Sequence, residues 1–226
     1  MKKLIELEDL IFYENKFYTI SGSNNSGKTT LIRTLKRNAN LKRSVETVIP
    51  FEIIMNKTNL FEELKYQNID IKLIDYLLKG LKFKSISKLD ISNLTKKNII
   101  LAQIVLALAH NPKVLLLDSI SNYLSDKELE SLYKFLRDYK DKYNLTLIST
   151  TIHLEEALLS DYLYILNEGK ILLEGDPLEV LQNDNILNRI GLNIPFMVDL
   201  SVKLRDYELI TEVELNKDRM VDILWK

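Results

Sequence analysis

The sequence contains no cysteine and few glycines and prolines. Its 226 residues include 6 glycines and 4 prolines. Without cysteine the chain cannot form disulfides or a metal site ligated by thiolates, and this absence fits a reducing compartment. Hydrophobic residues make up 46% and charged residues 28% of the chain. This composition excludes disordered and collagen-like classes and predicts one globular domain, alone or with a small appendage.

A surplus of one charge and a long hydrophobic run are also missing. The 31 basic and 32 acidic residues leave a net charge of -1, so we expect no nucleic-acid partner. The longest apolar stretch, residues 99–109, is interrupted by Gln103 and is shorter than the roughly 20 residues that span a bilayer. Acidic residues 6, 8 and 9 stand where a signal peptide would have its apolar core. We therefore expect any membrane association to be peripheral.

Two of the glycines lie in one loop between a predicted strand and a predicted helix. Residues 16–21 are β-branched and aromatic, as in a buried strand, and residues 29–36 carry apolar side chains at helical spacing. The loop between them reads Gly-Ser-Asn-Asn-Ser-Gly-Lys-Thr over residues 22–29. It fits the phosphate-binding pattern G-x-x-x-x-G-K-[ST], in the strand–loop–helix context that this pattern requires.

The chemistry of this pattern is specific. Backbone amides and the helix N-terminus bind phosphate, the Lys28 ammonium reaches the β- and γ-phosphates, and the Thr29 hydroxyl can ligate Mg²⁺. An ordinary Gly/Ser/Asn turn with a chance lysine is the alternative, but it does not explain why strand, loop and helix all agree with the pattern. The predicted nucleotide-binding residues are Gly22, Ser23, Asn24, Asn25, Ser26, Gly27, Lys28, Thr29 and Thr30.

A second apolar run, residues 114–118, ends in a carboxylate. It follows Asn-Pro and precedes a polar turn, which is typical of a buried strand. Asp118 at its end is predicted to complete the Mg²⁺ site with Thr29, as the second acidic element of a P-loop nucleotidase. The alternative is that Asp118 only caps the next loop.

The remaining pattern alternates strands with helices and predicts an α/β sheet covered on both faces. Residues 62–109 are mainly helical in pattern, and Ser125 and Glu128 form a capping-box signature that opens a helix to about residue 143. Further predicted elements are strands at 145–149, 162–166 and 170–174 and a helix at 153–159. We predict a nucleotide-binding domain over residues 1–190, with a helical subdomain at about 60–110, and a C-terminal association segment over residues 191–226.

The order of these motifs resembles an ABC-type ATPase. Residues 111–118 are similar to the segment that leads into the family's acidic motif, and residues 150–157 to its histidine-switch region. The tail, residues 191–226, resembles the C-terminal extension of the A components of energy-coupling-factor (ECF) transporters. The resemblance covers about residue 17 to the end, with a poor match over residues 36–94.

The resemblance also identifies departures at the positions of catalytic residues. Ser119 stands where the family has the glutamate that polarises the attacking water, and a serine hydroxyl is no base near neutral pH. Ile152 stands where the switch histidine is expected, and His153 lies one place later. The catalytic residues of this chain are therefore unknown. The signature loop falls on Leu94, Thr95, Lys96, Lys97 and Asn98, where two lysines replace glycines that allow close approach to phosphate.

Two further assignments follow from the resemblance. Glu52, after Phe51, occupies the position of the family's Q-loop glutamine. We expect the short N-terminus to lack the strand that carries an adenine-stacking aromatic residue. Tyr13 is a substitute candidate, with a buried strand tyrosine as the alternative.

The resemblance implies an ATP-binding transporter subunit with ATP and Mg²⁺ as cofactors. Its implied partners are a second ABC ATPase, in a heterodimer, and a transmembrane coupling subunit, at the cytoplasmic face of the cell membrane. Weak hydrolysis of its own is expected. Two other classes stay open, namely a non-catalytic scaffold and a soluble P-loop kinase or switch. Measuring ATP affinity distinguishes the scaffold from a transporter subunit. Co-purification with a membrane protein distinguishes the kinase or switch from it.

Overall fold

A computed structural model of the chain describes residues 2–7, 10–37 and 44–225. The chain divides into two compact units. The first comprises Met1–Phe17 and Lys28–Thr151, and the second comprises Tyr18–Gly27 and Ile152–Lys226. Residues 22–27 of the predicted phosphate-binding loop therefore belong to the second unit, and Lys28 and Thr29 belong to the first.

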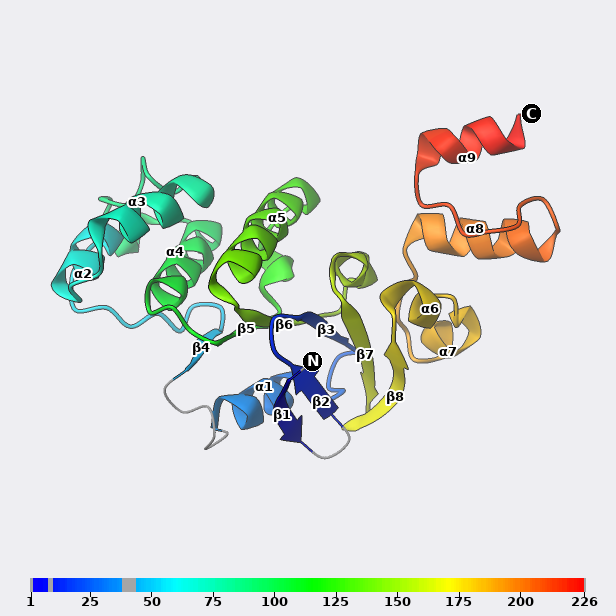
Figure 1. Ribbon diagram of the computed structural model, residues 1–226, viewed down its shortest axis with the longest axis horizontal. Coiled ribbons are helices and arrows are strands. Elements are labelled where there is room, and N and C mark those ends of the chain that lie inside the picture. Colours follow the sequence, from blue (N-terminus) through cyan, green and yellow to red (C-terminus); the bar gives the residue numbers. More distant parts are fainter. Residues whose placement is uncertain (1, 8–9, 38–43, 226) are drawn as a thin grey trace. The chain divides into compact units, whose positions relative to one another are not determined.

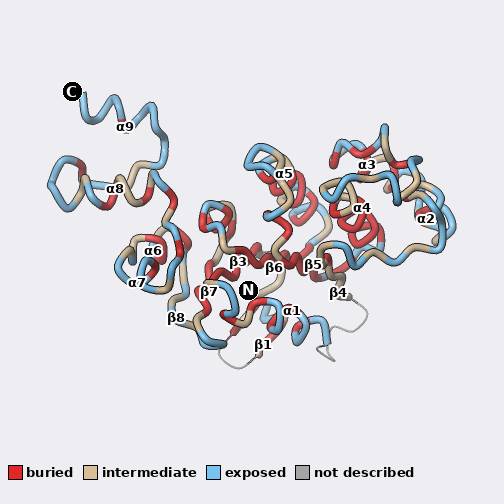
Figure 2. Tube along the Cα trace, turned by 180° about the vertical axis from the view of Figure 1, so that it is seen from behind, coloured by how far each residue is buried: buried red, intermediate tan, exposed pale blue. Residues whose placement is uncertain are grey.

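The sheet of the first unit is parallel, with the order β4-β5-β6 (Figure 1). It consists of β4 (Val45–Val48), β5 (Val114–Asp118) and β6 (Thr146–Thr151). Every residue of β5 and β6 is buried (Figure 2), as expected for strands covered on both faces. The register pairs Asp118 at the end of β5 with Thr150 on β6.

Helices cover both faces of this sheet (Figure 1). One face carries α1 (Lys28–Arg37), and the other carries α4 (Lys96–Ala109) and α5 (Asp126–Tyr143). Helix α5 begins with the predicted capping box, in which Ser125 and Glu128 satisfy each other's backbone amides, and it ends at Tyr143. The prediction of this helix is confirmed at both ends.

The predicted helical region is confirmed as well. Beside α4, it contains α2 (Leu60–Tyr66), α3 (Ile71–Gly80) and the 3₁₀ helix η2 (Ile91–Asn93). Helices α2 and α3 each pack against α4. The short 3₁₀ helix η3 (Ile120–Tyr123) follows β5.

The N-terminus corrects one expectation. It forms an antiparallel hairpin of β1 (Lys3–Leu7) and β2 (Leu10–Tyr13), so strands are present where we expected none, whereas a contact of Tyr13 with adenine stays a prediction. Tyr13, half-buried at the end of β2, pairs in register with Lys3. Phe12 beside it is fully buried, and burial of such alternate side chains holds the hairpin in place.

The second unit has a mixed sheet in the order β3-β7-β8. Strand β3 (Phe17–Ser21) runs parallel to β7 (Tyr162–Asn167), and β7 runs antiparallel to β8 (Lys170–Gly175). The predicted helix at 153–159 is a 3₁₀ helix, η4 (Leu154–Leu159), with His153 as its N-cap. Strand β8 alternates exposed and half-buried residues, which is typical of a strand with one solvated face.

Helices complete the second unit. They are α6 (Pro177–Leu181), α7 (Asp184–Arg189), α8 (Phe196–Asp206) and α9 (Lys217–Leu224). Leu192, Val198 and Val202 are buried in one apolar cluster with Leu163 and Ile165 of β7, so α8 packs on the core of this unit. In the part of the chain that the structure describes, no helix has the length and apolar character that crossing a bilayer requires.

Candidate nucleotide-binding site

The loop Gly22–Gly27 needs glycine at both ends. A Cβ on Gly22 would lie 2.3 Å from the Leu166 carbonyl oxygen and 2.6 Å from Ser26 Oγ, which no side chain tolerates. Gly27 has φ 103°, a left-handed conformation that glycine adopts without steric cost. The Gly169 amide donates to the Ser26 carbonyl at 3.0 Å, so the turn between β7 and β8 supports the loop.

Lys28 is the first residue of α1 and is buried, with 7% of its surface exposed. Burial lowers the pKa of its ammonium group, and the nearby Asp118 carboxylate partly opposes this shift. Desolvation disfavours the charged form of a lysine, and an opposite charge restores it. A phosphate bound at the loop would supply such a charge.

Thr29 and Asp118 meet although they are far apart in sequence. Thr29 Oγ1 donates to Asp118 Oδ1 at 3.4 Å, which joins the first turn of α1 to the end of β5. Lys28 shares this corner through its electrostatic interaction with Asp118. The structure therefore brings together the three predicted residues that carry charge or could ligate a metal.

Oxygen atoms dominate this corner, as Mg²⁺ requires. Asp118 is buried, with 4% of its surface exposed, and its Oδ2 accepts no hydrogen bond from the described residues. A free carboxylate oxygen beside a threonine hydroxyl fits a magnesium ion. Among the described residues no group of three or more His, Cys, Asp or Glu side chains gathers to hold a metal. The remaining ligands would come from phosphate and water.

Thr150 is a site residue that we did not predict. Its Oγ1 donates to Asp118 Oδ1 at 2.7 Å and accepts from the Ser119 amide at 3.1 Å. The signal available in the sequence is that residues 118 and 150 both end buried parallel strands. Adjacency of the two strands is a property of the fold that the sequence does not state.

Ser119 adopts a left-handed conformation with φ 52°, which is uncommon for any residue other than glycine. Its hydroxyl donates to Asp118 Oδ1 at 3.3 Å, and its amide donates to the Thr150 carbonyl at 3.1 Å. The position where the resemblance predicts a general base therefore carries a hydroxyl that is bonded to the Asp118 carboxylate.

The predicted signature segment forms the start of α4. Thr95 is the N-cap, and its Oγ1 accepts from the Asn98 amide at 3.3 Å. Leu94 closes η2 before it. Lys96 places its Nζ 5.8 Å from the centre of the Phe51 ring, and Phe51 contacts Tyr123 edge to face at 4.9 Å. Three segments distant in sequence thus meet, namely the Q-loop candidate, the predicted signature segment and η3 after β5.

Lys97 points to another partner. Its Nζ lies 2.6 Å from Glu128 Oε1. The same carboxylate accepts from the Ser125 amide at 3.0 Å through Oε2. These bonds hold the pKa of Glu128 down at about 2, with the Lys97 hydrogen bond as the largest cause. The charge of Lys97 is therefore compensated within the chain.

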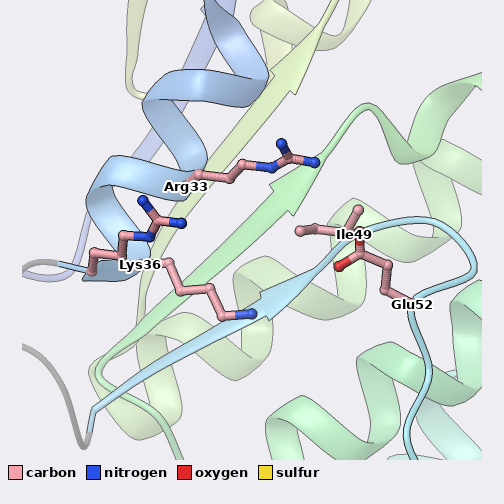
Figure 3. A pocket seen from close by; sticks show the side chains of 5 residues that line it. Arg33, Lys36, Ile49 and Glu52 are labelled. Atoms are coloured by element: carbon pink, nitrogen blue, oxygen red, sulfur yellow. The ribbon is translucent and has the colours of Figure 1, made fainter.

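Glu52 lies in a basic hollow of about 720 Å³ (Figure 3). Arg33, Lys36 and Arg37 of α1 line this hollow, together with Ile49. Three cations face one carboxylate there, so the hollow carries a local surplus of positive charge. Among the described residues, Glu52 makes no hydrogen bond to Thr29 or Asp118. Its Q-loop role stays a prediction.

Ile152 and His153 belong to the second unit. Ile152 is half-buried directly after β6, whereas His153 is exposed at the start of η4. An isoleucine side chain has no group that could bind phosphate or move a proton. A switch role for His153 stays a prediction.

Comparisons with known proteins support the same family as the motifs. No family model matches the chain. The chain is 27% identical to an energy-coupling factor transporter ATP-binding protein EcfA of Malacoplasma penetrans, over 97% of this chain and 88% of that protein. It is 27% identical to EcfA1 of Staphylococcus aureus, over 88% and 85% of the two chains. An EcfA1 of Lactobacillus delbrueckii subsp. bulgaricus is 35% identical over 53% of this chain and 43% of its own length.

Solved structures share the fold. The cbiO1 protein of Clostridium perfringens, part of the ABC transporter complex cbiONQ, superposes with a TM-score of 0.67 at 19% identity, covering 84% of this chain and 89% of that one. A nucleotide-free ATP-binding cassette from an ABC transporter gives 0.66 at 17% identity, covering 80% and 88%. The chain thus has the fold of the ABC-type P-loop ATPases and is a relative of the energy-coupling factor transporter ATP-binding proteins.

Proposed function

We propose that this chain is the ATP-binding subunit of an ECF-type transporter, located at the cytoplasmic face of the cell membrane. In this function it binds MgATP at residues 22–30 and closes against a second ABC ATPase, and the closure moves a transmembrane coupling subunit. The observation that carries the proposal is the corner formed by Lys28, Thr29 and Asp118, in a chain whose relatives are named as transporter ATP-binding proteins.

Each residue of the corner has a distinct part. Lys28 supplies a buried cation for the β- and γ-phosphates. The Thr29 hydroxyl and the Asp118 carboxylate would hold Mg²⁺, which, when bound, offsets the negative charge of the phosphates. A ligand that binds across an interface favours the closed state by its differential affinity for that state. ATP held by this chain and a second subunit would act in this way.

Hydrolysis at this chain's own site is proposed to be weak. Loss of a general base typically lowers a rate by about 10²- to 10⁴-fold. Ser119 and Ile152 supply neither a carboxylate nor an imidazole, which supports a subunit that mainly retains nucleotide. The exposed side chains of Val221, Leu224 and Trp225 on and after α9 support the proposal that residues 191–226 are an association segment.

Calorimetric titration with ATP and Mg²⁺ tests the proposal. Lys28→Ala is expected to weaken binding at least about tenfold, because a charge-assisted contact with phosphate contributes roughly 1.5–3 kcal/mol. Lys36→Ala, which removes an exposed lysine from the same helix, serves as the matched control and should bind as the unaltered chain does. Equal affinity of the Lys28→Ala variant and the control would refute nucleotide binding at this loop.

Co-purification tests the transporter part of the proposal. The chain, tagged and expressed with the genes that neighbour its own, should retain a second ABC ATPase and a membrane protein in detergent. Recovery of the chain alone, with intact MgATP binding, would instead favour a soluble P-loop kinase or switch.

A further inference from the structure

At the corner where Mg²⁺ is expected, Ser119 Oγ lies 3.4 Å from Thr150 Oγ1, and the Thr150 hydroxyl makes two shorter contacts. It donates its single proton to Asp118 Oδ1 at 2.7 Å, and its oxygen accepts from the Ser119 amide at 3.1 Å. Thr150 has 1% of its surface exposed, so no water substitutes readily for either bond. A threonine hydroxyl has one donor and two acceptor sites, and this one uses both kinds.

The contacts fall on one oxygen of the Asp118 carboxylate. Oδ1 accepts from Thr150 at 2.7 Å, from Ser119 at 3.3 Å and from Thr29 at 3.4 Å. The Thr150 bond is the shortest of the three. No hydrogen bond from the described residues reaches Oδ2. The carboxylate is therefore held by one oxygen and offers the other.

We propose that Thr150 is a positioning residue of the Mg²⁺–nucleotide site, which fixes the Asp118 carboxylate so that Oδ2 remains directed to the metal. This inference rests on the proposed function. Side chains that hold a metal-ligating carboxylate typically change metal affinity by about 10- to 100-fold when they are removed. Thr150 stands directly opposite Asp118 in the register of β5 and β6, so the two strands set the geometry of the contact.

The backbone after Asp118 supports the same role. Ser119 has φ 52°, a conformation that persists only where its surroundings hold it. Its amide donates both to the carbonyl and to the hydroxyl of Thr150. Thr150 therefore fixes the Asp118 side chain and the peptide that follows it.

The test is a Mg²⁺ titration of ATP affinity, measured by calorimetry on the full chain. Thr150→Val removes the hydroxyl and is expected to raise the Mg²⁺ concentration for half-maximal enhancement of binding by about tenfold or more. ATP affinity in EDTA should stay unchanged. Thr150→Ser, which keeps the hydroxyl, should restore the Mg²⁺ dependence of the unaltered chain.

Thr151→Val is the matched control. Thr151 is the next residue of β6 and is equally buried at 1%, but its hydroxyl contacts Ser121 Oγ at 3.2 Å. This variant should titrate as the unaltered chain does. If Thr150→Val does not fold, Thr150→Ser and Thr150→Ala replace it, and only the alanine variant should lose Mg²⁺ sensitivity.

Each outcome decides between claims. An unchanged Mg²⁺ dependence in Thr150→Val, or in Thr150→Ala where that variant replaces it, overturns the inference. The proposed function still stands in that case if the unaltered chain binds MgATP. An equal loss of affinity with Mg²⁺ and in EDTA also overturns the inference, since the hydroxyl would then support only the fold. Absence of ATP binding by the folded, unaltered chain overturns the proposed function, and the inference with it.

Discussion

Lys97 Nζ lies 2.6 Å from Glu128 Oε1, so the charge of one of the two lysines at the predicted signature position is compensated by the start of α5. Glycines at this position, in the resembled family, let the backbone approach phosphate. Here the lysine side chain instead joins two helix N-termini, and the same carboxylate completes the capping box at Ser125. Lys96, whose Nζ stands over the Phe51 ring, is the lysine of the pair without this compensation.

Glu128→Gln is expected to destabilise the chain by about 1 kcal/mol at pH 7, because it removes an ion pair and half of a capping box whose side chains are partly exposed. The pKa of Glu128 is lowered to about 2, which means that the ionised carboxylate stabilises the folded state. The stabilisation is present above the ordinary glutamate pKa of about 4.3 and is lost as pH falls toward 2. Urea unfolding measures this at pH 7 and at pH 3. The difference in the free energy of unfolding between Glu128→Gln and the unaltered chain should be smaller at pH 3.

Glu130→Gln is the control for this experiment, since Glu130 is an exposed residue of the same helix. It should leave the unfolding free energy nearly unchanged at both pH values. A difference for Glu128→Gln that stays constant between pH 7 and pH 3 would contradict the ion-pair account.

His110 is expected to stabilise the fold only while it is protonated. Its Nδ1 lies 3.0 Å from Glu46 Oε1, and its Nε2 lies 2.9 Å from Gln67 Oε1. The Gln67 amide nitrogen donates to Glu63, so its oxygen faces the histidine. Both ring nitrogens therefore donate, which requires an imidazolium. The hydrogen bond to Glu46 raises the pKa of His110, although burial opposes the shift.

The raised pKa means that this contribution is complete below the ordinary histidine pKa of about 6.5 and is lost as pH rises through the folded-state value. His110→Gln should cost less than about 1 kcal/mol at pH 6, because the pair is partly exposed, and still less at pH 9. Unfolding curves at the two pH values measure this. A cost of His110→Gln that is the same at pH 6 and at pH 9 would argue against the His110 contact.

Ser119→Glu alone is not expected to restore brisk ATP hydrolysis. Residues that act as a catalytic unit are strongly non-additive, and Ile152 and the signature lysines would remain. Ser119 is also held in a left-handed conformation by Thr150, so a new carboxylate there inherits a fixed direction. Phosphate release by the purified variant is the measurement, with ATP affinity as the check that the site survives. A gain above about 100-fold, within the range that a general base supplies, would refute this prediction.

Turnover is expected in a heterodimer and at the partner's own phosphate loop. In the head-to-tail pairing that the resemblance implies, each nucleotide lies between one chain's phosphate loop and the other chain's signature segment. A homodimer would combine Ser119, Ile152 and the signature lysines at both sites. A more complete partner keeps its own glutamate and histidine, although it faces Lys96 and Lys97 of this chain.

ATPase activity of the chain with and without its neighbouring ABC subunit tests this expectation. Removal of the partner's catalytic glutamate should abolish turnover, whereas Ser119→Ala in this chain should leave it nearly unchanged. Robust activity of this chain alone, or activity that survives loss of the partner's glutamate, would refute the assignment.

Local sequence determined much of this protein. The apolar run of β5, the capping box of α5 and the glycine spacing of residues 22–29 each specify their conformation through neighbours in the chain. The strand–loop–helix order around Lys28 likewise follows from short-range patterns. These features could be predicted because hydrophobic periodicity and capping act over a few residues.

Tertiary structure decided which of these pieces meet. Thr150 became part of the site because β6 lies beside β5 in register with Asp118, and strand order is a long-range property. Lys97 and Lys96 are adjacent in sequence, yet one pairs with Glu128 and the other with Phe51, because successive side chains on a helix point in different directions. The N-terminal hairpin was missed for the same kind of reason: residues 10–13 favour a strand by composition, but the pairing of two such short strands and the burial of Phe12 are decided by the fold.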